Sequence, residues 1–333
     1  MILPADHPPI PPRKIGVLLT NLGTPDAPDA KSVKRYLGEF LSDKRVVEIP
    51  AIAWQPILRG IILNTRPKKS AHAYGLVWSE DGSPLAAITK RQTAALQGAF
   101  GEGVLVDYAM RYGNPGIESR LTAMKQAGCE RILIAPLYPQ YCAATTATAN
   151  DKAFAALAGM RWQPAIRTLP PYHDDPAYIG ALKEQVEAQI ATLDFVPDAI
   201  LASFHGMPKR TLELGDPYHC HCQKTARLLG EAMNRELIIA FQSRFGPAKW
   251  LGPATDETLE AMPAKGIRKV AAIAPGFSAD CLETLEELAI RGRESFVAAG
   301  GTDFAYLPCL NDGAPGMAML RTLIANELRG WVD

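Results

Sequence analysis

Short apolar runs alternate with longer helical patterns along most of the chain. Apolar runs without polar alternation are typical of strands that are buried on both faces of a parallel sheet. Such runs predict strands at residues 15–20, 104–110, 131–137, 199–204, 237–241 and 269–274. Helical spacing predicts helices, among others, at residues 32–41, 118–126 and 317–331. This alternation predicts an α/β fold built on parallel sheets.

The predicted strands fall into two sets. The apolar pattern breaks at Pro170-Pro171-Tyr172, and a length of 333 residues favours two domains of about 150 residues each. We therefore expect two doubly wound domains that face each other across a cleft, at residues 1–172 and 173–312. The helix in residues 313–333 has no strand after it, so we expect it to pack back on the first domain. The two halves show only loose sequence similarity.

Composition narrows the class of protein. Lys plus Arg and Asp plus Glu number 35 each, so the zero net charge gives no general argument for nucleic-acid binding. No apolar run reaches the roughly 18 residues that span a bilayer. The first fourteen residues are rich in Pro and lack a signal-peptide core, which predicts a flexible tail. Six scattered cysteines without such a signal indicate a reducing, cytoplasmic compartment and no disulfide framework.

One apolar segment departs from the α/β pattern. Residues 52–63, IAWQPILRGIIL, contain Pro56 and Gly60, and the basic residues Arg66, Lys68 and Lys69 follow. An internal Pro and Gly make this segment an awkward core helix. An apolar segment with flanking cations can also lie in the interface of an anionic membrane or at the mouth of a pocket. The pattern alone favours neither interpretation over the other.

The stretch VAAIAPGFSADCLETLEEL, at residues 270–288, concentrates acidic side chains after a buried strand. Ser278 predicts the N-cap of a helix that begins just after it. Asp280, Glu283 and Glu287 would then stand at i, i+3 and i+7, on one face of that helix. A solvated acidic face is the simpler interpretation of such spacing. The position after a strand end, where open α/β sheets place ligands, favours a cation or proton site instead.

Histidines and cysteines give one candidate and one ambiguous cluster. His205 follows the apolar run that ends at Phe204, and Gly206 and Pro208 predict a turn that leaves its imidazole facing the cleft. A lone His at a strand end is more often structural, yet His205 and the three carboxylates could converge to bind a divalent metal or exchange protons. Residues 218–222, YHCHC, lack the second ligand pair of a usual zinc site, which favours a structural role.

Eight ordered motifs, which together extend over most of the chain, resemble those of ferrochelatases, enzymes that insert ferrous iron into a porphyrin to make haem. They are LLTNLGTPD, RPKKSAHAYGLVW, MRYGNPGIE, LYPQYCAATTAT, SFHGMPKR, GDPYHCHCQKT, FQSRFGPAKWLGPATDETL and GFSADCLETLEEL. The resemblance implies a chelatase-like pair of Rossmann-like domains, each with a four-stranded parallel sheet, facing a central cleft. It implies Fe²⁺ and protoporphyrin IX as substrates, with coproporphyrin III as the alternative porphyrin.

The resemblance also assigns roles to individual residues. His205 is similar to the family's catalytic histidine and Glu283 to its catalytic carboxylate, on opposite sides of the macrocycle. His205 and Glu283 are also expected metal ligands, and Glu287 and Asp280 extend an acidic path for metal or protons. The implied porphyrin contacts are Arg111, Tyr112, Ser83, Trp250 and Leu22. The implied apolar lip, which faces a membrane, contains Ile52, Trp54, Ile57, Leu58 and Ile61.

Some features depart from the family pattern. Cys281 stands where some members carry a His, which weakens a role for this residue in metal delivery. The chain shows no C-terminal cysteine extension, so we expect no iron–sulfur cluster and no required cofactor. Partners implied by the resemblance are the porphyrin, ferrous iron and the inner-membrane surface, with a monomer or homodimer and no nucleic acid. A cobalt chelatase of the same fold and a non-enzymatic porphyrin or haem carrier are the alternative functions.

Overall fold

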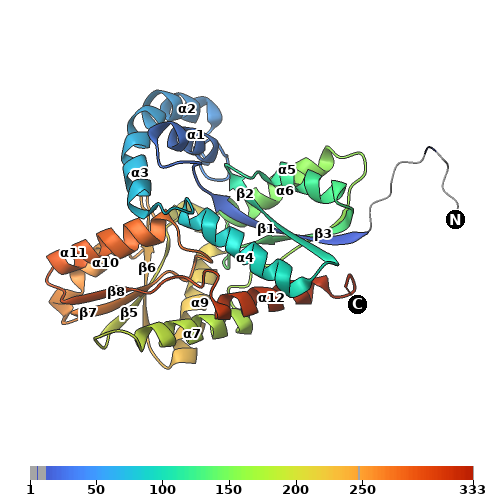
Figure 1. Cartoon of the computed structure of the whole chain (residues 1–333). Coiled ribbons are helices and arrows are strands. Elements are labelled where there is room, and N and C mark those ends of the chain that lie inside the picture. Colours follow the sequence, from blue (N-terminus) through green and yellow to red (C-terminus); the bar gives the residue numbers. More distant parts are fainter. Residues whose placement is uncertain (1–5, 7–12, 247, 333) are drawn as a thin grey trace.

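Two four-stranded parallel sheets organise the protein (Figure 1). The structure, a computed structural model, describes residues 6, 13–246 and 248–332. The first sheet has the order β2-β1-β3-β4 and the second the order β6-β5-β7-β8. The prediction of an α/β fold with two four-stranded parallel sheets is therefore confirmed. The predicted N-terminal tail lies almost entirely outside the described residues.

The first sheet draws its strands from the first half of the chain. These are β1 (Lys14–Gly23), β2 (Val104–Tyr112), β3 (Cys129–Pro136) and β4 (Ala165–Thr168). The helical elements of this half are α1 (Ala30–Leu41), α2 (Ala51–Ile57), η1 (Leu58–Ile62), α3 (Leu63–Val77), α4 (Pro84–Phe100), α5 (Ile117–Gln126), η2 (Ala143–Ala147) and α6 (Thr148–Ala158). The central strand β1 is buried over Val17, Leu18 and Leu19, as its unbroken apolar run predicts.

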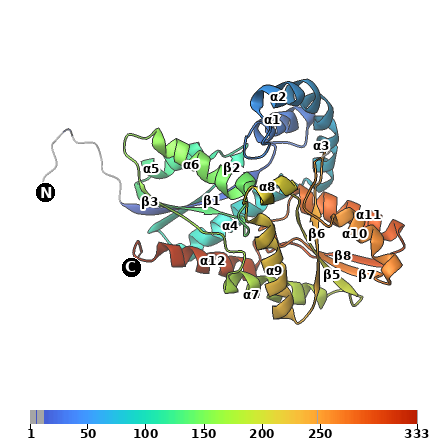
Figure 2. The ribbon, with the colours of Figure 1, turned by 180° about the vertical axis from the view of Figure 1, so that it is seen from behind.

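The second sheet repeats this arrangement. Its strands are β5 (Ala199–His205), β6 (Leu237–Gln242), β7 (Lys269–Ile273) and β8 (Asp303–Tyr306). The remaining helical elements are α7 (Pro176–Ile190), α8 (Lys209–Glu213), α9 (Tyr218–Met233), α10 (Thr255–Ala261), η3 (Pro263–Lys265), η4 (Glu283–Gly292), α11 (Arg293–Ala298) and α12 (Ala314–Leu328). Figure 2 shows α7 and α9 from behind, and the two helices contact each other. Their apolar residues belong to a core that both halves share.

The six predicted strands are all present, and each end lies within three residues of the prediction. The two strands that the pattern missed are β4 and β8, with four residues each. Each lies at the edge of its sheet, and neither contains a fully buried residue. Short edge strands lack the continuous apolar run of a central strand, so the pattern gave no signal for them.

Polar contacts join the two halves. Gln92 on α4 is buried and donates through Nε2 to the backbone carbonyl of Asn311 at 2.8 Å. Arg91 forms an ion pair with Asp312, with Nε and Oδ2 2.7 Å apart. Helix α12 contacts α4 and β3 of the first half as well as α7. The domain bounds that we expect from the sequence stay a prediction.

No helix in the part of the chain that the structure describes combines the length and the apolar character that crossing a bilayer requires.

Candidate active site

His205 is the last residue of β5, a central strand of the second sheet. Its Nδ1 lies 2.7 Å from the carbonyl oxygen of Gly206. A carbonyl only accepts, so Nδ1–H donates and the lone pair of the neutral ring lies on Nε2. The Tyr218 hydroxyl donates to the His205 carbonyl at 3.0 Å and fixes the backbone there. Nε2 is therefore the nitrogen that can accept a proton or bind a metal.

The turn after His205 needs a glycine. The backbone N–H of Gly206 donates to the carbonyl of Gln242 at 2.7 Å, which brings the ends of β5 and β6 together. A Cβ at position 206 would lie 2.6 Å from that carbonyl oxygen and 3.3 Å from the Trp250 ring. Such a Cβ would force the turn away from β6. Gly206 thus lets the turn after His205 lie close to both the end of β6 and the Trp250 ring.

The acidic stretch forms a π-helix and not the α-helix that we predicted. The helix η4 begins at Glu283, so the prediction that Ser278 caps a helix starting just after it is wrong. Gln242, which is buried at the end of β6, donates through Nε2 to the Glu283 carbonyl at 2.7 Å. The i→i+5 turn of a π-helix is rare and is often found at functional sites.

Glu287 is held by the residue after β6. Its carboxylate accepts from the backbone N–H of Ser243 at 2.7 Å and from Ser243 Oγ at 2.6 Å. Ser243 adopts φ 66°, an uncommon value for a residue with a side chain. Burial raises the pKa of Glu287, whereas the Ser243 hydrogen bond and the nearby His205 lower it and Glu283 raises it. His205, Glu283 and Glu287 are thus electrostatic neighbours.

Asp280 is not part of this arrangement. It precedes η4 and is buried, and its carboxylate accepts from Thr284 Oγ1 at 2.9 Å and from the side chains of Tyr306 and Asn311. These donors satisfy it as an anchor for the start of the helix. The expectation that Asp280 shares a helix face with Glu283 and Glu287 is therefore wrong.

A preformed cluster of metal ligands is also absent from residues 6, 13–246 and 248–332. No three His, Cys, Asp or Glu side chains among them converge closely enough to hold a metal ion. The predicted convergence of His205 with three carboxylates on one point is wrong in this form. What the structure places together is a strand-end imidazole and two acids on the neighbouring π-helix.

The hydroxyl of Tyr74 and the thiol of Cys281 lie near Glu283. Burial first, and then charge on Glu283, raises the pKa of both Tyr74 and Cys281. Tyr74 comes from α3 and packs in a small apolar cluster with Val33, with Leu282 against it. The π-helix therefore begins against helices that flank the apolar lip.

Arg111 and Tyr112, at the end of β2, converge on Asp43. Tyr112 is fully buried, and its hydroxyl donates to Asp43 Oδ2 at 2.9 Å. Arg111 pairs with the same carboxylate, and its Nε donates to Thr148 Oγ1 at 2.7 Å. Burial leaves Tyr112 no surface for a porphyrin, so its expected role as a direct contact is not supported. Asp43 and Thr148 were not predicted, because isolated Asp and Thr residues carry no pattern.

The other expected porphyrin contacts lie in different surroundings. Ser83 is buried and immediately precedes α4, whose Leu85 and Ile88 cluster with Cys281. Leu22, near the end of β1, is half-buried. Trp250 is half-buried, and its ring lies 5.1 Å from that of Phe245, measured between centroids.

The apolar segment is helical throughout, from α2 through η1 into α3, despite Pro56 and Gly60. Ile52, Ile57 and Ile61 are exposed, with 89%, 42% and 58% of their surface accessible. Leu58 is fully buried, which contradicts its placement on the lip. Trp54 is half-buried, and its Nε1 donates to the Leu41 carbonyl at 2.6 Å. The exposed lip is therefore narrower than predicted.

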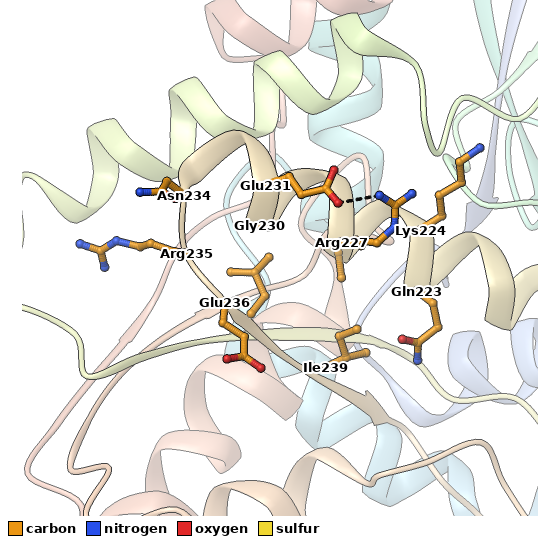
Figure 3. A pocket seen from close by; sticks show the side chains of 11 residues that line it. Gln223, Lys224, Arg227, Gly230, Glu231, Asn234, Arg235, Glu236 and Ile239 are labelled. Carbon is orange, nitrogen blue, oxygen red and sulfur yellow. Dashed lines mark hydrogen bonds and ion pairs between the residues drawn. The ribbon is translucent and has the colours of Figure 1, made fainter.

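A cavity of about 730 Å³ lies elsewhere, between α9 and β6. Figure 3 shows its lining of mixed charge, in which Arg227 pairs with Glu231. It includes neither His205 nor Glu283. Sequence reasoning also missed Gln242 and Ser243, although both stand in the motif FQSRFGPAKWLGPATDETL directly after a predicted strand. Their position at that strand end was the available signal.

Comparisons with known proteins identify the family of the chain. The family model "Ferrochelatase" matches residues 14–328. A protein named ferrochelatase from Rhizobium meliloti (strain 1021) is 56% identical to this chain, and the alignment covers 98% of each chain. Another, from Methylocella silvestris, is 49% identical, and the alignment covers 96% of this chain and 95% of the relative. The chain belongs to the ferrochelatase family, and it is an enzyme that inserts iron into a porphyrin in haem biosynthesis. The resemblance seen in the sequence is confirmed.

Solved structures show the same fold. SirB from Bacillus subtilis with Fe³⁺ aligns with a TM-score of 0.57 at 13% identity, over 96% of this chain and 97% of that chain. CbiX, described as the terminal enzyme for siroheme biosynthesis in denitrifying bacteria, aligns with a TM-score of 0.52 at 13% identity, over 94% of this chain and 99% of that chain. At this identity the likeness concerns the fold alone.

Proposed function

We propose that the porphyrin substrate is protoporphyrin IX and that His205 and Glu283 carry out the insertion of Fe²⁺. The observation that supports this most is the connection through the end of β6. Gln242 binds the start of the π-helix and, through its backbone, the turn after His205. A half-buried imidazole and two carboxylates are thereby held on neighbouring elements.

The reaction requires these residue types. A free-base porphyrin is planar and carries two pyrrole N–H protons, so the metal enters only when the ring puckers and the protons leave. A neutral imidazole can accept a proton through Nε2, and carboxylates are hard oxygen ligands that can hold and release Fe²⁺. Walls that fit the distorted ring better than the flat ring lower the barrier by differential binding.

The surrounding residues have separate roles in this proposal. Glu287 supplies Fe²⁺ to Glu283 along one face of the π-helix. Trp250 and Leu22, which are both half-buried, contact the porphyrin, and the position of Trp250 against Gly206 supports this role. Ser83 is buried, so like Tyr112 it acts as a support and not as a direct contact. Arg111, through its contacts with Asp43 and Thr148, positions the end of β2 beside the porphyrin. Tyr112 and Asp280 act as buried supports.

We propose further that the exposed lip residues Ile52, Ile57 and Ile61 bind an anionic membrane surface without insertion. Their exposure and the basic residues on the following helix support this proposal. Apolar burial and charge attraction act together in such contacts.

The enzyme works without an iron–sulfur cluster in this proposal. Such a cluster needs four thiolates at one place. The six cysteines are free, and four of them, Cys129, Cys142, Cys281 and Cys309, are single buried residues on separate segments. After anaerobic purification, we expect iron and acid-labile sulfide well below two of each per chain. About two of each, with [2Fe–2S] absorption, would contradict the proposal.

The substrate proposal is tested by a stopped assay with Fe²⁺ and one porphyrin, read by loss of porphyrin fluorescence. We expect kcat/KM to be at least about tenfold higher for protoporphyrin IX than for coproporphyrin III, which corresponds to about 1.4 kcal/mol of transition-state binding. A preference for coproporphyrin III would overturn the choice of porphyrin and leave the chelatase assignment intact. Binding of both porphyrins without metal insertion would contradict the assignment itself.

A further inference from the structure

The stretch Tyr218–Cys222, whose two histidines the active site does not use, begins helix α9. His221 from this stretch lies against His173, which precedes α7 in the segment that leads from the first sheet to the second. We propose that His173 and His221 form a proton-sensitive joint between the two halves of the molecule. The joint is closed when both imidazoles are neutral and opens when they take up protons.

The stacking of the two rings is the first observation. Their centroids are 3.5 Å apart and their planes differ by 5°, so the rings are in face-to-face contact. Two imidazolium ions at this separation would repel each other strongly, because their charges would be in contact and partly shielded from water. Full stacking therefore requires that at least one ring is neutral.

A hydrogen bond to His221 is a second reason why this ring must be neutral in the closed joint. The backbone N–H of Tyr141, in the first half, donates to His221 Nδ1 at 3.2 Å. A nitrogen that accepts carries no proton, so the proton of neutral His221 is on Nε2. Protonation of Nδ1 would set N–H against N–H and break this bond. The same segment is held by Asp216, which accepts from the Ala143 N–H at 2.7 Å.

The charged groups around the pair compensate two positive rings only in part. Asp174 Oδ1 lies 3.7 Å from His173 Nδ1, but the same carboxylate also pairs with Lys224. Asp216 already accepts from the N–H groups of Ala143 and Tyr218. Burial first, and then His221, lowers the pKa of His173 to about 4, with Asp174 opposing and Lys224 assisting. Burial also lowers the pKa of His221, with Asp174 and Asp216 opposing and Lys224 assisting.

The direction of the pH effect follows from these contacts. An unfolded histidine titrates near pH 6.5. Between that pH and the lower pKa values in the folded protein, the unfolded chain binds more protons than the folded one. The joint therefore contributes its full stability above about pH 6.5 and loses it progressively as the pH falls towards about 4. Opening would release the residues that lead into the π-helix η2 of the first half.

The test compares melting temperatures of the full chain between pH 7 and pH 5. The double variant His173→Phe with His221→Asn keeps a flat ring and an acceptor for the Tyr141 N–H but cannot take up protons. We expect its loss of Tm over this range to be smaller than that of the wild type by about 2–4 °C. His72→Asn, which changes an exposed histidine, is the matched control and should behave as the wild type. Equal slopes in the double variant and the wild type would overturn the proposal.

A second measurement needs no variant. Hydrogen exchange of the wild type, corrected for the intrinsic pH dependence of exchange, should show loss of protection in a peptide that contains Tyr141 and Ala143 as the pH falls from 7 to 5. The peptide that contains His72 should keep its protection relative to the rest of the chain. Unchanged protection around Tyr141 at pH 5 would contradict the joint even if the double variant failed to fold. Both measurements are made without substrates and are therefore independent of the proposed porphyrin chemistry.

Discussion

The two halves of the molecule share their strand order, and each interrupts its helical geometry at the same place. After the third strand of each half, a π-helix runs directly into an α-helix, η2 into α6 and η4 into α11. The π-helix after β3, AATTA, contains only small side chains. The π-helix after β7, ETLEELAIRG, contains Glu283 and Glu287 near the histidine that ends β5. The backbone is thus duplicated, whereas the ionisable groups are not.

This difference indicates how the halves divide the work. At the end of β2, Tyr112 donates a hydrogen bond to Asp43 and Arg111 forms an ion pair with it. The polar groups at this strand end of the first half are therefore bound to one another. At the end of β6, the equivalent place in the second sheet, Gln242 and Ser243 hold the π-helix and its acid. In the proposed function, the first half supplies the lip and part of the porphyrin contact, and the second half supplies His205, Glu283 and Glu287.

The largest effect is expected at the strand end of the second half. His205→Ala should lose nearly all turnover and keep porphyrin binding, because the apolar walls provide most of the contact. Leu22→Ala, near the end of the central strand of the first half, is the matched variant. It should raise KM for the porphyrin and change kcat only a few-fold. Steady-state kinetics would contradict the division if His205→Ala kept more than about a tenth of wild-type turnover, a loss below 1.4 kcal/mol.

Sequence patterns predicted the central strands because a buried parallel strand needs an unbroken apolar run, as in Val17–Leu19. They also placed His205 and the acids at strand ends, which the topology of parallel sheets requires. The π-helix was not predictable, because its i→i+5 bonds depend on tertiary contacts such as that from Gln242 to Glu283. Asp280 shows the same limit. Its spacing fits the acidic face of an α-helix. In the structure, however, its carboxylate is bound by Tyr306 and Asn311, which are 26 and 31 residues further along the chain.

The lip gives a second way to test the comparison. Ile57→Ser with Ile61→Ser should weaken flotation with anionic vesicles, because it removes exposed apolar surface from the first half. High salt should weaken binding as well, since it screens the basic residues of α3. Val196→Ser, which changes an exposed apolar residue of the second half, is the control and should have no effect. Unchanged flotation of the double variant would show that the lip is not the contact.

A smaller effect concerns the free energy of unfolding. Because burial raises the pKa of Glu287, the folded protein keeps a proton there over a range in which the unfolded chain, near pKa 4.3, releases it. Stability therefore falls as the pH rises through this range, and the cost is complete once the pH exceeds the raised pKa of the folded protein. Glu287→Gln should remove the cost and gain a few tenths of a kcal/mol from relief of like-charge repulsion.

Thermal melts check this prediction against a neighbouring acid. Glu286 pairs with Arg291, with Oε1 and Nε 3.0 Å apart, so Glu286→Gln should lower Tm slightly at pH 7. Glu287→Gln should raise Tm, and its gain should disappear below about pH 4. If both variants shifted Tm in the same direction at pH 7, the charge on Glu287 would not lower the free energy of unfolding as proposed.

Steady-state kinetics of Glu283→Gln and Glu287→Gln, with both Fe²⁺ and the porphyrin varied, test most directly whether the π-helix η4 carries the chemistry. Glu283→Gln should lower kcat by about 10²–10⁴-fold and keep KM for the porphyrin, because it removes the carboxylate at the reaction centre. Glu287→Gln should mainly raise KM for Fe²⁺, because a supplying ligand is weakened. Equal and mild effects of the two variants would contradict the account and leave the acids of η4 as a solvated face.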